Sequence, residues 1–169
     1  MKKFVIIALA VVLAAGGGFW YWHTVNSDER RIARVLEACA ETAGFRQGEA
    51  QVGAFLKLRK FEELLTPEVN ATIRINDRTY RERLPVREII QRLAAVRKMT
   101  SYLDIELSDL AIAVAGDKAT ADASVQLKTA SGGADKYRDS AVEEVRFTLT
   151  KADGNWRVTA VRAKDFMER

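Results

Sequence analysis

Apolar and polar residues alternate along the last third of the chain, from Tyr102 to Phe166. In the clearest run, Lys118–Ala130, every second residue from Ala119 to Leu127 is Ala, Val or Leu, and the residues between them are polar. A period of two is typical of a β-strand with one buried face and one solvated face. The pattern predicts four consecutive strands: Tyr102–Ala115, Lys118–Ala130, Val142–Lys151 and Trp156–Phe166.

Short turn sequences separate these predicted strands. Gly116-Asp117 and Asp153-Gly154 are typical hairpin turns, because Gly and Asp adopt positive φ at low cost. A longer loop, Ser131–Ser140, joins the middle two strands. We therefore expect an antiparallel sheet whose apolar face must be covered by residues that precede Tyr102.

Three segments before Tyr102 have the spacing of amphipathic helices. The first is expected from Ser27 or Asp28, either of which can act as N-cap, to Ala43, where Gly44 follows. The others are expected at Glu49–Leu65 and, after Pro85, at Val86–Met99. Two short strands, Val69–Ile75 and Thr79–Arg83, are expected between them. The predicted fold class is α+β: a short hairpin and a four-strand meander form a curved antiparallel sheet, and three helices cover one face to make a cone.

The N-terminus predicts a membrane segment. Lys2 and Lys3 precede Phe4–Trp22, a run of 19 residues without charge, and about 20 are needed to cross a bilayer. Trp20, Tyr21 and Trp22 would lie at the interface. The run also resembles a signal peptide with small residues at Ala14-Ala15-Gly16, so a cleaved signal is the alternative to an anchor.

The expected organisation follows from this segment. Residues 1–3 form a cytoplasmic tip, 4–22 the transmembrane anchor or signal, 23–27 a linker, and 28–169 one domain. The two lysines favour a cytoplasmic N-terminus, so we expect a single-pass bacterial inner-membrane protein with its domain in the periplasm or outside the cell. Secretion after cleavage is the alternative. Cys39, the only cysteine, cannot form an internal disulfide, and its helical position favours burial.

The order of elements, with the residues that punctuate it, resembles the nuclear transport factor 2-like superfamily, also called the SnoaL-like or cystatin-like α+β fold. The resemblance covers residues 28–166. It implies a fold only, because members include enzymes, carriers and assembly domains. Three segments carry it: Lys60–Val69, Val114–Ala121, and Val145–Thr150 with Asp153–Val158.

Enzymes of that superfamily place an acid or a His-Asp pair inside the cone, and the inward positions predicted here are apolar. By parity, Asp104, Glu106, Asp122 and Glu144 lie on the wet face. His23 is the only histidine and lies outside the domain. We therefore expect no catalytic residue, no metal site and no cofactor. A ligand cavity has four aromatic candidates, for which an ordinary position in the core or at the rim is the alternative: Trp156, Phe147, Tyr102 and Tyr80.

Charge does not point to nucleic acid. The chain has 27 basic and 23 acidic residues, and without Lys2 and Lys3 the domain has a net charge of only +2. Eight basic residues gather between Arg74 and Lys98, which suggests either a solvated face or a patch for anionic headgroups or an acidic partner. The predicted outer face of the sheet is polar, which favours a monomer or a weak dimer.

These observations favour a non-enzymatic, membrane-anchored, extracytoplasmic binding or assembly module, with an envelope protein as partner. A carrier that holds a small apolar ligand in the cone is the alternative. An isomerase- or hydrolase-like enzyme of the SnoaL type is a third hypothesis.

Overall fold

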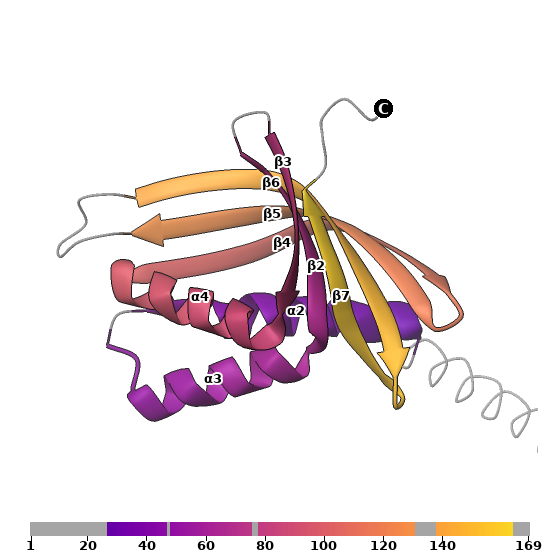
Figure 1. Cartoon of the computed structure of the whole chain (residues 1–169), viewed down its shortest axis with the longest axis horizontal. Coiled ribbons are helices and arrows are strands. Elements are labelled where there is room, and N and C mark those ends of the chain that lie inside the picture. The colour runs from indigo at the N-terminus through magenta and orange to yellow at the C-terminus, as the bar shows by residue number, and fades with distance from the viewer. Residues whose placement is uncertain (1–26, 47, 76–77, 131–137, 164–169) are drawn as a thin grey trace, which may run out of the picture.

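The computed structural model describes residues 27–46, 48–75, 78–130 and 138–163. Its helices and strands follow one another as predicted, with one additional short strand (Figure 1). The helices are α2 (Asp28–Ala43), α3 (Gln51–Glu63) and α4 (Val86–Met99). The strands are β1 (Phe45–Arg46), β2 (Leu65–Ile75), β3 (Arg78–Pro85), β4 (Tyr102–Ala115), β5 (Lys118–Ala130), β6 (Arg138–Ala152) and β7 (Asn155–Ala163).

All seven strands form one sheet in the order β1-β4-β5-β6-β7-β2-β3. The predicted meander β4–β7 is present and antiparallel throughout. The prediction of a wholly antiparallel sheet is wrong, however, because β2 pairs with β7 in parallel. Alternation of apolar residues shows which face of a strand is buried, but it carries no information on the direction of the neighbouring strand.

Several boundaries differ from those expected. Helix α3 ends at Glu63, and β2 starts at Leu65, four residues before the predicted strand. The register of β2 against β7 shifts between Leu65 and Asn70, where Pro67 has no N–H to offer the ladder. Phe45 and Arg46, which were expected only to interrupt the helical pattern, form β1 at the edge beside β4.

The two tight hairpins confirm the predicted turns. Gly116, the first residue of the β4–β5 turn, has φ +62°, and Asp153 and Gly154 between β6 and β7 have φ +52° and +76°. Positive φ at the first or at both central residues matches the twist of the flanking strands, so these turns fix the register of the meander.

Two β-bulges preserve the apolar face of the sheet where the strands bend. In β4 the register against β5 shifts between Ser108 and Ala111, around Asp109 with φ +53°. Before this bulge the odd-numbered residues of β4, such as Leu107, face the core. After it the even-numbered residues, such as Ile112, do so. In β7 a second register shift lies between Val158 and Ala160. Simple alternation would turn Ala160 toward the core, but after the shift Val161 packs against it.

Helix α2 supplies the principal cover of the concave face. Ile32 and Leu36 are fully buried in one cluster with Leu149 and Val158 of the sheet. Within the described parts of α3 and α4, by contrast, no residue is fully buried. The three predicted helices are thus present, but only α2 is packed into the core along its length.

The predicted anchor, residues 4–22, lies outside the described residues, as do the tip and the linker up to Asn26. Among the helices that are described, none has the length and apolar character needed to cross a membrane.

A charged cluster joins the first turn of α2 to the β6–β7 hairpin. Ser27 caps the helix by accepting a hydrogen bond from the Arg30 N–H. The Asp28 carboxylate accepts hydrogen bonds from the Trp156 indole N–H, at 3.0 Å, and from the Lys151 ammonium group, at 3.1 Å. The Trp156 bond, followed by the contacts with Lys151, lowers the pKa of Asp28 below its ordinary value.

We expect Asp28→Asn to lower the free energy of unfolding by about 1–2 kcal/mol near pH 7, because a charged acceptor is lost at a helix N-terminus. The pKa of Asp28 is lower in the folded state, so its contribution is present above pH ~4 and is lost as the pH falls further. Urea unfolding between pH 7 and pH 2.5 measures both effects. The exposed neighbour substitution Glu29→Gln is the control, and equal pH profiles for Asp28→Asn and the wild type would contradict this assignment.

Candidate functional site

An apolar cavity of about 240 Å³ lies between helix α2 and the concave face of the sheet. One wall is the inner side of α2, the opposite wall is formed by β4, β5, β6 and β7, and Phe61 and Leu65 contribute from α3 and β2. Apart from Cys39, every lining residue is aliphatic or aromatic: Leu36, Ala40, Ala43, Phe61, Leu65, Ile105, Leu107, Val125, Leu127, Val145, Phe147, Val158 and Val161.

The thiol of Cys39 is the one polar side-chain group on this wall. Burial, which disfavours the charged thiolate, raises its pKa to about 12. The group is therefore a neutral thiol at physiological pH and behaves as a small apolar side chain. Within the described residues no group of His, Cys, Asp or Glu side chains could hold a metal ion.

The acids of the meander point away from the cavity. Glu106 binds Lys128 at 2.6 Å, and Asp122 forms a two-pronged ion pair with Arg146 at 2.8 and 3.0 Å. Both pairs lie on the outer face, as the parity predicted. Glu143 differs, because it lies opposite Val125 and shares the parity of Val145. It is exposed and does not line the cavity, so it stands at the rim of the concave face.

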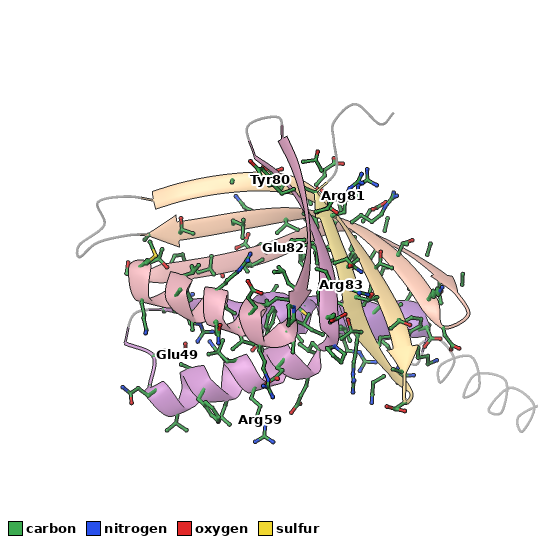
Figure 2. The ribbon with its side chains drawn as sticks, in the orientation of Figure 1. Glu49, Arg59, Tyr80, Arg81, Glu82 and Arg83 are labelled. Atoms are coloured by element: carbon green, nitrogen blue, oxygen red, sulfur yellow. The ribbon has the colours of Figure 1, made fainter. Side chains whose placement is uncertain are left out.

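The four aromatic candidates occupy different places. Phe147 lines the cavity. Trp156 is buried in the core beneath Asp28 and does not line it. Tyr102 is half-buried at the start of β4, and the Arg46 guanidinium lies 5.8 Å from the centre of its ring. Tyr80 is half exposed on the edge strand β3 (Figure 2). The structure does not bring these four side chains together.

Helix α2 contributes one wall of the cavity, and none of the four aromatic candidates lies on it. Leu36, Cys39, Ala40 and Ala43 recur at helical spacing and form the helical wall. The sequence contains this signal, since Leu36, Cys39 and Ala43 have the spacing of one face of the first expected helix. The pattern does not reveal that small side chains at positions 39, 40 and 43 leave space against the sheet.

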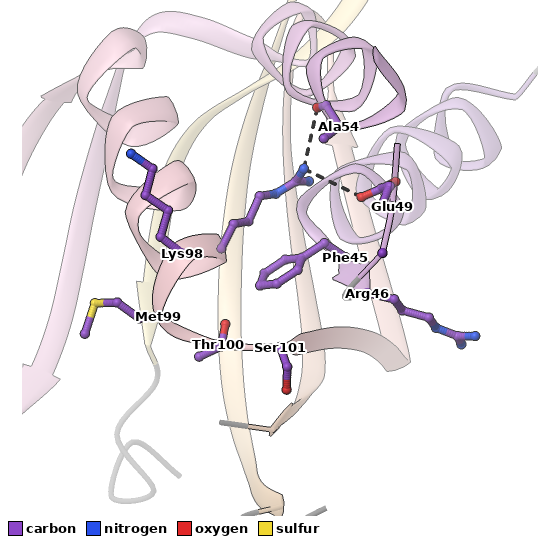
Figure 3. A pocket seen from close by; sticks show the side chains of 10 residues that line it. Phe45, Arg46, Glu49, Ala54, Lys98, Met99, Thr100 and Ser101 are labelled. Atoms are coloured by element: carbon purple, nitrogen blue, oxygen red, sulfur yellow. Dashed lines mark hydrogen bonds and ion pairs between the residues drawn. The ribbon is translucent and has the colours of Figure 1, made fainter. Parts of the chain in front are cut away.

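A second hollow, of about 490 Å³, opens where the C-terminal end of α4 meets β1 and the start of α3 (Figure 3). Its buried cation, Arg97, donates to the carbonyls of Thr42 and Gly44 at the end of α2, at 3.0 and 3.4 Å. The guanidinium also lies 3.8 Å from Glu49 and 5.3 Å from the Phe45 ring centre. The two terminal nitrogens of Arg97 therefore hold the end of α2 to the neighbouring elements, whereas its buried Nε–H has no hydrogen-bond partner among the described residues.

The basic stretch from Arg74 to Lys98 is partly neutralised by ion pairs among its described side chains. Arg92 binds Glu82 and Glu88 at 2.8 and 2.7 Å, and Arg83 binds Glu68 at 3.1 Å. Hydrogen bonding to Glu82 and Glu88 raises the pKa of Arg92 above its ordinary value. Figure 2 shows Arg81, Glu82 and Arg83 along β3, where both signs of charge alternate. This arrangement matches a solvated face better than a single-sign patch.

Comparison with known proteins supports the fold. No family model matches the sequence, and no curated protein matches it. Solved structures do match. A Kribbella flavida protein has a TM-score of 0.68 at 14% identity, with 83% of this chain and 91% of that chain covered. A nuclear transport factor 2-like protein with a cystatin-like fold from Novosphingobium aromaticivorans has 0.62 at 13%, with 89% and 90% covered.

A candidate dehydratase of the nuclear transport factor 2-like family from Streptomyces avermitilis has a TM-score of 0.60 at 15% identity, with 82% of this chain and 95% of that chain covered. Identities this low show the fold alone. Two of these three structures are described as nuclear transport factor 2-like, one of them with a cystatin-like fold, and this is the fold that the order of elements predicted.

Proposed function

We propose that this chain is a non-enzymatic, membrane-anchored binding module whose cone holds a small apolar ligand or an apolar group of a larger partner. The single observation that carries the proposal is the wall of the cavity, which is apolar throughout except for a neutral thiol. Such a wall recognises shape and hydrophobicity, because it offers neither a charge nor a hydrogen-bond donor stronger than S–H.

The volume limits the size of the bound group. About 240 Å³ exceeds the roughly 150 Å³ of an engineered apolar cavity that takes up benzene. It falls below the roughly 300 Å³ at which pockets for drug-sized ligands begin. A single aromatic ring, a short acyl chain or one large apolar side chain of a partner has the appropriate size.

The SnoaL-type enzyme is a weaker alternative, although one structural neighbour is a candidate dehydratase. General acid–base catalysis needs a titratable group within hydrogen-bonding reach of the substrate. The cavity lining has no such group apart from Cys39, whose raised pKa keeps it protonated. Glu143, at the rim, is the residue that this alternative would have to use.

The state of Cys39 gives a direct measure of the cavity. At pH 8 we expect the folded full-length chain in lipid nanodiscs to react with methyl methanethiosulfonate on the order of 10³-fold more slowly than an ordinary thiol, because almost no thiolate is present. The rate should rise about tenfold per pH unit from pH 8 to pH 11. Intact-mass spectrometry follows the reaction. A plateau near pH 9 would show an ordinary, exposed thiol instead.

Ligand binding should protect the same thiol. We expect benzene to slow the modification of Cys39 several-fold, and Val125→Phe or Ala40→Leu to abolish the protection by filling the cavity. Val114→Phe is the control, since Val114 is half-buried beside the core cluster but outside the cavity lining. Protection that survives both cavity substitutions in folded protein would refute the cavity as the binding site.

Membrane anchorage is part of the proposal and rests on the uncharged run Phe4–Trp22. Leu9→Arg together with Val12→Arg should move the chain from the membrane to the soluble fraction of bacterial cells, because each charge costs about 2.5–3.5 kcal/mol at the centre of a spanning helix. Asn26→Arg, outside the run, is the control. Accessibility to protease in spheroplasts measures the side on which the domain lies, and an intact mass that lacks the first residues would show signal cleavage instead of an anchor.

A further inference from the structure

Helix α3 presents an apolar stripe to solvent. Val52, Phe55 and Leu56 are 71%, 64% and 57% exposed. Their spacing of three and four residues places them on one side of the helix. Exposed apolar side chains are common singly, but three large ones on one face of one helix indicate an interaction surface.

The opposite side of α3 is only loosely held. Phe61 and Leu58 are half-buried, and no residue of the helix is fully buried. In Figure 1 the helix forms the lower edge of the domain, outside α2. The apolar stripe is therefore not an unused part of the core, because a core already exists on the inner side of α2.

The chain that precedes α2 indicates what covers this stripe. The uncharged run ends at Trp22, five residues separate it from Asp28, and a linker of five residues spans at most about 18 Å. The first turns of α2 and the end of α3 line one shallow hollow, which includes Arg31, Arg34 and Glu63. A bilayer that holds residues 4–22 is thus within reach of the start of α2, and α3 extends from there by about 20 Å.

We propose that α3 lies on the surface of the lipid bilayer, with Val52, Phe55 and Leu56 inserted at the boundary between headgroups and acyl chains. This inference rests on the proposed membrane anchorage. An interfacial helix buries its apolar face about 5–10 Å into that boundary, and Phe and Leu are typical of such faces. Because the anchor would hold α3 close to the bilayer, the stripe would not have to bind a membrane strongly by itself.

The charges of α3 determine which lipids are needed. Lys57 lies 2.6 Å from Glu49, which precedes the helix. Arg59 and Lys60 are followed by Glu62 and Glu63, and Arg59 lies 3.8 Å from Glu63. These charges cancel, so docking is driven by apolar insertion and is independent of anionic lipid. Docking through a basic patch would differ, because it would require acidic headgroups and would weaken as salt is added.

Two apolar positions with nearly equal exposed fractions allow a controlled test. Leu56 on α3 and Val142 on β6 are 57% and 59% exposed. The full-length chain with Cys39→Ala is given a single spin label through Leu56→Cys or Val142→Cys and is reconstituted in phosphatidylcholine vesicles, with or without phosphatidylglycerol. Flotation measures anchorage. Electron paramagnetic resonance then compares collisions of the label with oxygen, which enters lipid, and with a nickel chelate, which stays in water.

We expect the label at position 56 to collide several-fold less with the nickel chelate than the label at position 142, equally in both lipid mixtures. Adding Phe55→Ser should return the position 56 label to water. A chain that floats but carries a water-accessible label at position 56 would overturn the docking and leave anchorage intact. A chain that does not float overturns both. Spin–spin coupling at position 56 that disappears on dilution with unlabelled chain would assign the stripe to a second copy and also overturn the inference.

Discussion

Helix α2 and the concave face of the sheet depend on one another, and the remaining structure is arranged around this contact. The helix can bury Ile32 and Leu36 only if the strands beneath it remain apolar along a curved path. The bulges in β4 and β7 supply this continuity. Without the shift at Asp109, Ile112 and Val114 would face water, and the sheet would lose half of its apolar face in β4. Curvature and burial are therefore set by the same few residues.

Much of this fold was predictable from the sequence, because local signals specify it. The bounds of α2, α4, β4 and β5 coincide with those expected, since caps, Pro85 and hairpin turns mark them. The parallel pairing of β2 with β7 was not predictable, because pairing partners far apart in sequence leave no local pattern. The cavity was foreseen only in part. Phe147 was a candidate, but Cys39, Ala40 and Ala43 create the space by being small, and that depends on their distance from the sheet.

The chemistry of the cavity follows from the requirements of the fold. Residues that face α2 must be apolar for the core to form, and the acids of the meander accordingly take the outer parity, where Arg146 and Lys128 pair with them. An enzyme built on such a cone would have to place a charge inside it at a cost of several kcal/mol. In β6, Glu143 lies on the same side of the strand as the cavity residue Val145, but it is exposed at the rim of the concave face. An interior of this kind is suited to binding by shape.

The uneven cover of the sheet links the cavity with the surface of α3. If α3 and α4 packed as closely as α2, they would bury more of their own apolar residues, and no stripe would remain exposed on α3. The chain instead places small residues on α2, keeps α3 without a single fully buried residue, and turns Val52, Phe55 and Leu56 outward. Each departure costs burial that a monomeric domain in water would be expected to use. The exposed stripe on α3 regains this burial if the helix docks on a bilayer, as proposed above.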